Sequence, residues 1–281
     1  YIGSHIVYSL IKRGNKIVVV DNLSNSKKIT LDKIRNLTKK NISFYKVDIT
    51  DRDELEKVFQ ENDIKNVIHL AGLKSVSESI IKPSYYMKNN YEGSINLFKV
   101  MKKYNVFELI FSSSATVYGE PCELPITESH PRKPLNPYGV SKSKVEDYMY
   151  NLSKDSADWK LICLRYFNPL GASLQKFSGD FSFEKHENIM PKLLKAHLNI
   201  SQYFEIYGND YDTKDGSGIR DYIHIEDLVD GHICALNFLE RTRGYETFNL
   251  GTGKGYSVFE LIDCFEKITN KKLSIKISPR R

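Results

Sequence analysis

Cysteine is scarce in this sequence, and the few cysteines form no recognisable pattern. The four residues, Cys122, Cys163, Cys234 and Cys264, lie far apart and show no Cys-x-x-Cys or Cys/His ligand spacing. Such spacings mark zinc sites and disulfide frameworks. We therefore expect reduced thiols, no metal site and a cytoplasmic location.

Long apolar runs and clustered positive charge are also absent. No apolar stretch approaches the ~18 residues that span a bilayer, and the first residues, YIGSHIVYSLIKRG, have the pattern of an amphipathic helix rather than of a signal peptide. The net charge is +6, but the lysines are spread along the chain, whereas a nucleic-acid site needs a basic stripe with aromatic side chains. We expect neither a membrane nor a nucleic acid as a partner.

Apolar strand-like stretches alternate with helical stretches through the first half of the chain. Continuous Val/Ile/Leu runs are typical of strands in a parallel sheet whose two faces are covered by the intervening helices. The sequence therefore predicts an α/β fold with a doubly wound, mostly parallel sheet of the Rossmann type. The expected strands span about 15–22, 42–50, 66–72, 107–115 and 160–168, and the expected helices 2–13, 51–62, 90–105 and 138–152.

A glycine beside small residues opens the first helical stretch, with no strand in front of it. A dinucleotide fingerprint has a strand, a tight glycine turn, and a third glycine where helix and strand pack closely. Gly3 fits the third glycine. Asp21, at the end of the next strand, fits the acid that accepts hydrogen bonds from ribose hydroxyls and favours NAD. A strand ending in Asp is also a common turn cap, so both interpretations stand; on the first, the first strand of the sheet is missing from this chain.

The rhythm of the sequence changes after about residue 168, although no Pro/Gly/Ser-rich linker marks the change. A helix is expected over 188–198, a short strand over 203–208, a polar loop over 209–222 and a helix over 224–240. We predict a Rossmann-like NAD-binding domain over 1–168 and a smaller, interleaved substrate-binding lobe over 169–281, which the family resemblance described below makes a nucleotide-sugar-binding lobe.

A tyrosine stands four residues before a lysine at three places, and that spacing alone has little meaning in a chain with 18 tyrosines. The three pairs are Tyr8/Lys12, Tyr138/Lys142 and Tyr150/Lys154. Only the second pair follows a polar stretch at a strand end, the serines that finish with Ser114, and ligands of doubly wound sheets bind at strand ends. A phenol is a poor base at neutral pH, but a nearby ammonium favours its phenolate form. We therefore expect Tyr138 and Lys142 to form a catalytic pair.

Ten segments resemble, in order, those of the UDP-glucose 4-epimerase (UDP-galactose 4-epimerase) family of extended short-chain dehydrogenases/reductases. They are YIGSH, VDNLSNS, HLAGLKSVSES, FSSSATVYGEP, NPYGVSK, LRYFNPLGA, NIMP, IYGNDYDTKDGSGIRDYIHIEDLVDGH, FNLGTGKGYSV and SPRR. The resemblance covers essentially the whole chain. The pieces GNDYDTKDGSGIRDYIH and AGLKSVSES are specific to the epimerases within that superfamily, whereas Tyr-x-x-x-Lys and the glycine turn are not.

The resemblance implies a role for each matching position. Tyr138 is expected as the base, Lys142 as its partner and Ser114 as an aid at the sugar oxygen. The positions expected to line NAD are Ile2, Asp21, Asn22, Asn25, Ser26, Asp48, Ile49, Ala71, Lys74, Asn89, Tyr138, Lys142 and Tyr166. Those expected to hold the UDP-sugar are Ser114, Tyr138, Asn168, Asn188, Ile189, Tyr207, Arg220 and Arg281. The two arginines suit diphosphate oxygens, which a guanidinium fork matches; a surface ion pair is the alternative for each.

The reaction implied by the resemblance is a round trip at C4 of the sugar. Tyr138 takes the 4-hydroxyl proton while C4 gives hydride to NAD⁺; the 4-keto sugar turns over and takes hydride back on its other face. UDP-glucose and UDP-galactose are thereby interconverted, a step of galactose metabolism, and NAD stays bound. The family resemblance also implies a homodimer, expected through helices near 86–104 and 138–153.

The chain departs from the family pattern in three ways. The first strand and its glycine turn are absent, the chain stops at Arg281, and one residue fewer than usual separates Ser114 from Tyr138, which places the deletion in the loop over 119–136.

Two other functions stay open. A nucleotide-sugar 4,6-dehydratase of the same scaffold needs an Asp-Glu pair directly after the position of Ser114, where this chain has Ala115 and Thr116. A non-catalytic NAD-binding module predicts loss of the base or its partner. Tyr138, Lys142 and Ser114 are all present, which disfavours the module.

Overall fold

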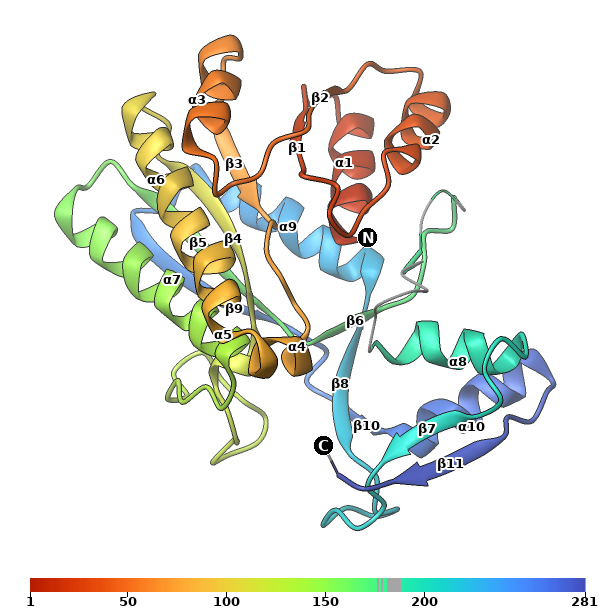
Figure 1. Ribbon diagram of the computed structural model, residues 1–281. Helices are drawn as coiled ribbons and strands as arrows, with labels where there is room; N and C mark the ends of the chain where they lie inside the picture. The colour runs from red at the N-terminus through yellow and green to blue at the C-terminus, as the bar shows by residue number, and fades with distance from the viewer. Residues whose placement is uncertain (176, 178, 181–187, 281) are drawn as a thin grey trace.

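A four-stranded parallel sheet lies at the centre of the larger part of the molecule, as the computed structural model shows (Figure 1). The structure describes residues 1–175, 177, 179–180 and 188–280. The strand order is β3 (Asn66–His69), β4 (Glu108–Ser114), β5 (Lys160–Tyr166) and β9 (Gly244–Leu250). The predicted α/β fold with a mostly parallel sheet is confirmed. Since β9 comes from late in the chain and pairs with β5, the two parts are interleaved; the boundary at residue 168 stays a prediction.

Two further strands, β1 (Val18–Val20) and β2 (Ser43–Tyr45), form a separate parallel pair. Among the described residues, no backbone pairing joins β1 to β3. The strand that the fingerprint predicts ahead of Tyr1 concerns residues outside this chain and stays a prediction.

Helices cover both faces of the sheet because side chains of a strand alternate between them. Leu109 and Phe111 of β4 face the helices α3, α6 and α7, whereas Ile110 faces α9; α1 packs against α9 on that second face. The bounds are α1 (Ile2–Lys12), α2 (Ile29–Thr38), α3 (Arg52–Glu61), α6 (Gly93–Lys103), α7 (Pro137–Asp155) and α9 (Ile225–Leu239). The doubly wound arrangement is the predicted one, although α2 was not among the expected helices.

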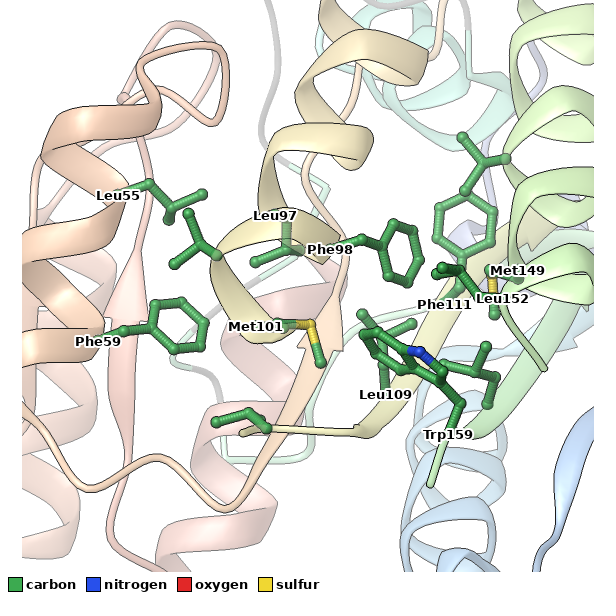
Figure 2. Packing of buried hydrophobic residues seen from close by; sticks show 14 of the residues in the cluster. Leu55, Phe59, Leu97, Phe98, Met101, Leu109, Phe111, Met149, Leu152 and Trp159 are labelled. Atoms are coloured by element: carbon green, nitrogen blue, oxygen red, sulfur yellow. The ribbon is translucent and has the colours of Figure 1, made fainter. Parts of the chain in front are cut away.

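An aromatic cluster fastens α6 and α7 to the sheet (Figure 2). Trp159, just ahead of β5, is fully buried and meets Phe98 and Phe107 edge-on, with ring centroids 5.9 and 5.2 Å away. Met149 of α7 belongs to the same cluster. Truncating a buried aromatic of this kind costs about 3–5 kcal/mol, so α7 is held firmly where it carries the expected catalytic pair.

A π-helix interrupts the long helical segment that follows β3. The segment runs through α4 (Val76–Ile81), α5 (Pro83–Tyr86) and the π-helix η1 (Met87–Glu92) into α6. Only its second half was predicted from the sequence. A π-helix carries an extra residue in its turn and occurs mostly near functional sites, and η1 contains Asn89 and Asn90, both buried.

The smaller lobe is built from short strands and helices (Figure 1). Its elements are β6 (Asn168–Leu170), α8 (Ile189–His197), β7 (Phe204–Tyr207), β8 (Ile219–His224), β10 (Gly255–Ser257), α10 (Val258–Thr269) and β11 (Ile275–Ser278). The prediction of a loop over 209–222 is wrong at its end, where β8 begins. The polar residues of β8 gave no alternation, and the strand forms because β6 and β10 pair with it on either side.

Candidate active site

The first turn of α7 presents Tyr138 at the carboxyl end of β4. Asn136 caps the helix by accepting a hydrogen bond from the Gly139 N–H at 2.8 Å, and Pro137 occupies the first helical position. Both residue types are favoured there. Tyr138 and Lys142 are one turn apart and therefore share a helix face.

Lys142 is buried against β4. It is 4% exposed, its Nζ donates to the Ser112 carbonyl oxygen at 2.7 Å, and it lies 4.7 Å from the centre of the Phe111 ring. Burial lowers the pKa of Lys142 to about 8, although Cys163 and Glu146 oppose the shift. The ammonium is thus fixed at the strand end, with the cost of desolvation partly offset by a carbonyl and an aromatic face.

Ser114, the last residue of β4, faces Tyr138. Its Oγ accepts from the Thr116 N–H at 3.2 Å and the Thr116 hydroxyl at 2.9 Å, in the 3₁₀ turn η2 (Ala115–Val117). Burial raises the pKa of Tyr138 and a hydrogen bond with Ser114 lowers it, with a net rise. The lowered pKa expected from the sequence is therefore not supplied by the protein groups alone, because the Lys142 ammonium points to Ser112.

Asn90 of the π-helix ties the loop after β3 to the catalytic helix. Its side chain accepts from the Leu73 N–H at 2.7 Å and donates to the Leu73 carbonyl at 2.9 Å and to the Ser141 hydroxyl at 3.0 Å. Ser141 in turn donates to the Tyr138 carbonyl at 2.7 Å. Asn90 was missed from the sequence, where only its neighbour Asn89 was expected to act.

The polar residues after β1 and β2 form two hydrogen-bonded pairs, Asp21 with Ser26 and Asn22 with Asp48, which are neighbours because Asp21 and Asn22 are adjacent in the chain. Asp21 accepts from the Leu23 N–H at 2.7 Å and the Ser26 hydroxyl at 2.8 Å, and Asn22 donates to Asp48 at 2.7 Å. Burial raises the pKa of Asp48, but hydrogen bonds from Thr50 and Asn22 outweigh it and leave the pKa below its ordinary value. The structure thus brings Asp21, Asn22, Ser26 and Asp48 together.

The other residues expected to line NAD lie along the same strand ends. Ile2 is the first residue of α1, and Asn89 lies in η1. Ile49 is buried in the segment after β2, whereas Asn25, Ala71 and Lys74 are exposed in loops. Tyr166 is different: it is buried at the end of β5, and its hydroxyl meets His232 Nε2 at 2.5 Å.

Two glycines show that the backbone near these strand ends needs room. A Cβ on Gly3 would come within 3.3 Å of Leu70 Cδ1, which is the close packing of helix on strand expected of a third fingerprint glycine. A Cβ on Gly72 would lie 3.2 Å from Asn90 Oδ1 and 3.5 Å from Lys142 Nζ. With the carboxylate of Asp21 directly after β1, the residues present fit a dinucleotide.

The residues expected to hold the UDP part lie on the smaller lobe. Asn168 opens β6 and donates to the Asp221 carbonyl at 3.0 Å, and Arg220 of β8 is exposed, with NH1 donating to the Ile219 carbonyl at 2.7 Å. Asn188 caps α8 ahead of Ile189 and donates to Asp180 at 2.6 Å; Tyr207 ends β7 and donates to Glu205 at 2.5 Å. Arg281 lies outside the described residues.

Asp221, which was also missed, joins the lobe to the end of the sheet. Its carboxylate accepts hydrogen bonds from the Thr252 N–H at 2.8 and 2.9 Å, the Thr252 hydroxyl at 2.7 Å and the Gly253 N–H at 2.8 Å. These groups belong to the turn between β9 and β10. Successive backbone N–H groups form an anion-binding site. The Asp221 carboxylate, next to Arg220 in the chain, occupies the site formed by the Thr252 and Gly253 N–H groups.

The two other Tyr/Lys pairs lie elsewhere. Tyr8 stacks on Phe177, with ring centroids 4.7 Å apart, and Tyr150 lies toward the far end of α7 with Lys154 5.0 Å from its ring centre. Within the described ranges, no helix has the length and apolarity to cross a membrane, and no group of three His, Cys, Asp or Glu side chains in that part of the chain can hold a metal ion.

Comparisons with known proteins agree with this geometry. The model of the NAD dependent epimerase/dehydratase family matches residues 1–251. The UDP-glucose 4-epimerase GEPI48 of Cyamopsis tetragonoloba is 45% identical over 285 residues, covering 100% of this chain and 81% of that protein. The UDP-glucose 4-epimerase of Bacillus subtilis (strain 168) is 43% identical over 281 residues, covering 100% and 83%.

A solved structure is similar throughout. The UDP-glucose 4-epimerase from Bifidobacterium longum, in complex with NAD⁺ and UDP, has a TM-score of 0.96 and 42% identity, covering 100% of this chain and 84% of that one. With a matching family model, relatives above 40% identity and a shared fold, this chain belongs to the NAD dependent epimerase/dehydratase family, among the UDP-glucose 4-epimerases.

Proposed function

We propose that this protein interconverts UDP-glucose and UDP-galactose by NAD-dependent epimerisation at C4, through a 4-keto sugar. The observation that carries the proposal is the hydrogen bond between Tyr138 and Ser114 at the carboxyl end of β4, with the Lys142 ammonium bound to the backbone of the same strand at Ser112. A phenol, an ammonium and a hydroxyl at one strand end are what proton removal from a sugar hydroxyl requires.

Each of the three side chains has its own part. Tyr138 removes the proton from the 4-hydroxyl and later returns one, and Ser114 hydrogen-bonds the same oxygen. Lys142 is held by the Ser112 carbonyl, so its positive charge stays beside the reaction without leaving the strand. NAD⁺, when bound, supplies the hydride acceptor and a second positive charge that favours the phenolate.

Residues on the two sides of the site hold the two ligands. The Asp21–Ser26 and Asn22–Asp48 pairs would hold the adenosine ribose and base of NAD. On the lobe, Arg220 offers an exposed guanidinium suited to diphosphate, and Asn168 and Asn188 offer amides. Anchoring the UDP part leaves the sugar free to turn over.

The residues directly after Ser114 disfavour a dehydratase activity. Elimination needs an acid directly after Ser114, but Thr116 there donates its hydroxyl to Ser114 and Ala115 carries no proton donor. Because the base and its partner are both in place, a non-catalytic module is disfavoured too.

We also propose that the protein acts as a homodimer in the cytoplasm. Apolar side chains are exposed on α4, α5 and α7, namely Ile80, Ile81, Tyr85 and Tyr150. Tyr150 lies in the helix expected near 138–153, and the other three side chains lie directly before the helix expected near 86–104. We propose that this surface binds the second copy. Light scattering coupled to size-exclusion chromatography tests the dimer, and a monomer at micromolar concentration would contradict it.

The activity is tested by incubating the purified chain with NAD and either UDP-sugar and identifying the product by proton NMR. We expect both sugars to reach the same mixture. A 4-keto-6-deoxy product would indicate the dehydratase, and bound NAD without turnover would indicate the module.

A further inference from the structure

Glu146 is a buried carboxylate with no part in the chemistry described so far. It lies on α7 one turn after Lys142 and is 1% exposed. A carboxylate this deep is tolerated only when charges and hydrogen bonds surround it. Strands β4, β5 and β9 and the loop ahead of α7 supply them; the contact from β9 is the Tyr245 hydroxyl, which donates to Glu146 at 3.4 Å.

Its first two partners come from the central strands. Ser113 of β4 donates its hydroxyl to Glu146 at 2.5 Å, and Arg165 of β5 donates through Nε at 3.1 and 3.2 Å and through NH2 at 2.6 Å. The third is Arg132 of the loop ahead of α7, whose NH1 lies 3.3 Å from Glu146 Oε2. One carboxylate thus joins α7 to β4, β5, β9 and the loop.

The network continues beyond Arg165. Its NH1 donates to the Tyr118 hydroxyl at 2.8 Å and the Glu128 carbonyl at 3.1 Å, and Tyr118 donates to Asn249 of β9 at 2.7 Å. The loop that delivers Tyr138 to the site is therefore bound to the same network as the strands.

Ser113 has a particular place in this arrangement. The residue before it is Ser112, whose carbonyl oxygen accepts a hydrogen bond from the Lys142 ammonium, and the residue after it is Ser114. Ser113 points toward the middle of α7, where it meets Glu146, and Ser114, at the end of the strand, meets Tyr138 in the first turn of the same helix. Glu146 therefore binds β4 at Ser113, which lies between Ser112, the residue that binds Lys142, and Ser114, the residue that binds Tyr138.

We propose that Glu146 is a positioning residue, which fixes α7 over β4 through Ser113 so that Tyr138 meets Ser114 while Lys142 stays bound to the same strand. The inference rests on the proposed epimerase function. The alternative is a buried ion pair that stabilises the fold and nothing else. The two differ in what E146Q does, because an amide turns an N–H toward the Arg165 donors and loosens the network without changing its size.

The test compares E146Q with E108Q. Glu108 accepts from Lys160 at 2.9 Å and joins the same two strands, β4 and β5, at their opposite end. We expect E146Q to lower kcat by about 30- to 100-fold, the scale of a misplacement near 1 Å, with KM for UDP-glucose changed less than about threefold and NAD retained on gel filtration. E108Q should keep the wild-type kcat.

A second measurement separates positioning from stability. If Glu146 acts through Ser113, S113A/E146Q should lose no more than about threefold in kcat beyond E146Q alone, since both substitutions release the same contact. Multiplying effects, or a wild-type kcat in E146Q with only a lower melting temperature, would overturn the proposal. If E146Q does not fold, S113A alone must lower kcat about tenfold without raising KM. An inactive wild type would instead refute the proposed function.

Discussion

The two sides of the proposed site are built in opposite ways. On the sheet side, Lys142 and Glu146 are 4% and 1% exposed and are held by hydrogen bonds to several elements. On the lobe side, Arg220 is exposed on β8, which pairs with β10, and the carboxylate of the next residue, Asp221, binds the turn that leads into β10. Rigid, dry surroundings suit groups that move protons, whereas an open guanidinium suits a ligand that arrives from water.

Because the two sides of the site are built differently, we expect substitutions on one side to change the catalytic rate and substitutions on the other to change substrate affinity. Substitutions on the sheet side should act mainly on kcat, because they change groups that matter in the transition state. Substitutions on the lobe side should act mainly on KM. The four predictions that follow try to break that division, beginning with the largest effect.

The first prediction concerns the base. Y138F removes the proton acceptor and should lower kcat by at least about 10³-fold, near the upper end for acid–base catalysis. NAD and UDP should bind nearly as well as to the wild type, measured by calorimetry. Y8F, in the Tyr8/Lys12 pair on α1, is the matched control. Near-normal turnover in Y138F would show that Tyr138 is not the base.

The second prediction concerns the pH dependence of stability, which tests whether the histidines on the sheet side are buried away from water. Burial lowers the pKa of His69 to about 3 and that of His232 to about 4. Both stay neutral when folded but take up a proton below about pH 6.5 when unfolded, so stability falls as the pH falls. We expect urea unfolding to show a loss of about 3 kcal/mol between pH 7.5 and 5.5, to which His5, also lowered by burial, adds.

The hydrogen bonds of His232 fix which nitrogen carries its proton. Its Nδ1 lies 2.8 Å from the Leu228 carbonyl and must donate, so Nε2 accepts from Tyr166. The double variant H69N/H232N should flatten the pH dependence. An unchanged slope in that variant would show that these imidazoles are not the dry groups described.

The third prediction moves to the lobe. R220A should raise KM for UDP-glucose about 30-fold, the loss of one or two charge-assisted hydrogen bonds, while kcat stays within about threefold. R220K should recover little, because an ammonium lacks the guanidinium fork. R13A, an arginine on the far surface paired with Asp230 at 3.5 Å, should behave as the wild type. A fall in kcat with constant KM would contradict the division.

The smallest effect is expected at the joint between the two sides. D221N keeps the shape of the side chain but removes the charge that the Thr252 and Gly253 N–H groups surround. We expect KM to rise about fivefold through a less ordered Arg220, with kcat unchanged. D230N is the matched carboxylate control. Should kcat fall as well, the joint would belong to the catalytic side.

The sequence predicted β3, β4 and β5 of the central sheet because these strands are continuous apolar runs, but it did not predict β9, the fourth strand, in which polar and apolar residues are mixed. It did not predict β8, whose residues are polar and whose pairing comes from partners distant in the chain. It also missed Glu146 and Arg165, although each left a signal. Glu146 is four residues past Lys142, on the same helix face, and Arg165 interrupts the apolar run LICLRY, where a buried cation requires a carboxylate partner.

The π-helix in η1 makes the length of its segment a fixed quantity. Removing one residue between 87 and 92 would let the backbone close into ordinary α-helical turns, with the residues on either side keeping their helix faces. Phe98 and Met101 would then stay in the core, but Asn90 would lose the wide turn that presents its side chain to the loop after β3. In evolution, we therefore expect amino-acid substitutions in this segment to be tolerated more easily than the deletion of a single residue.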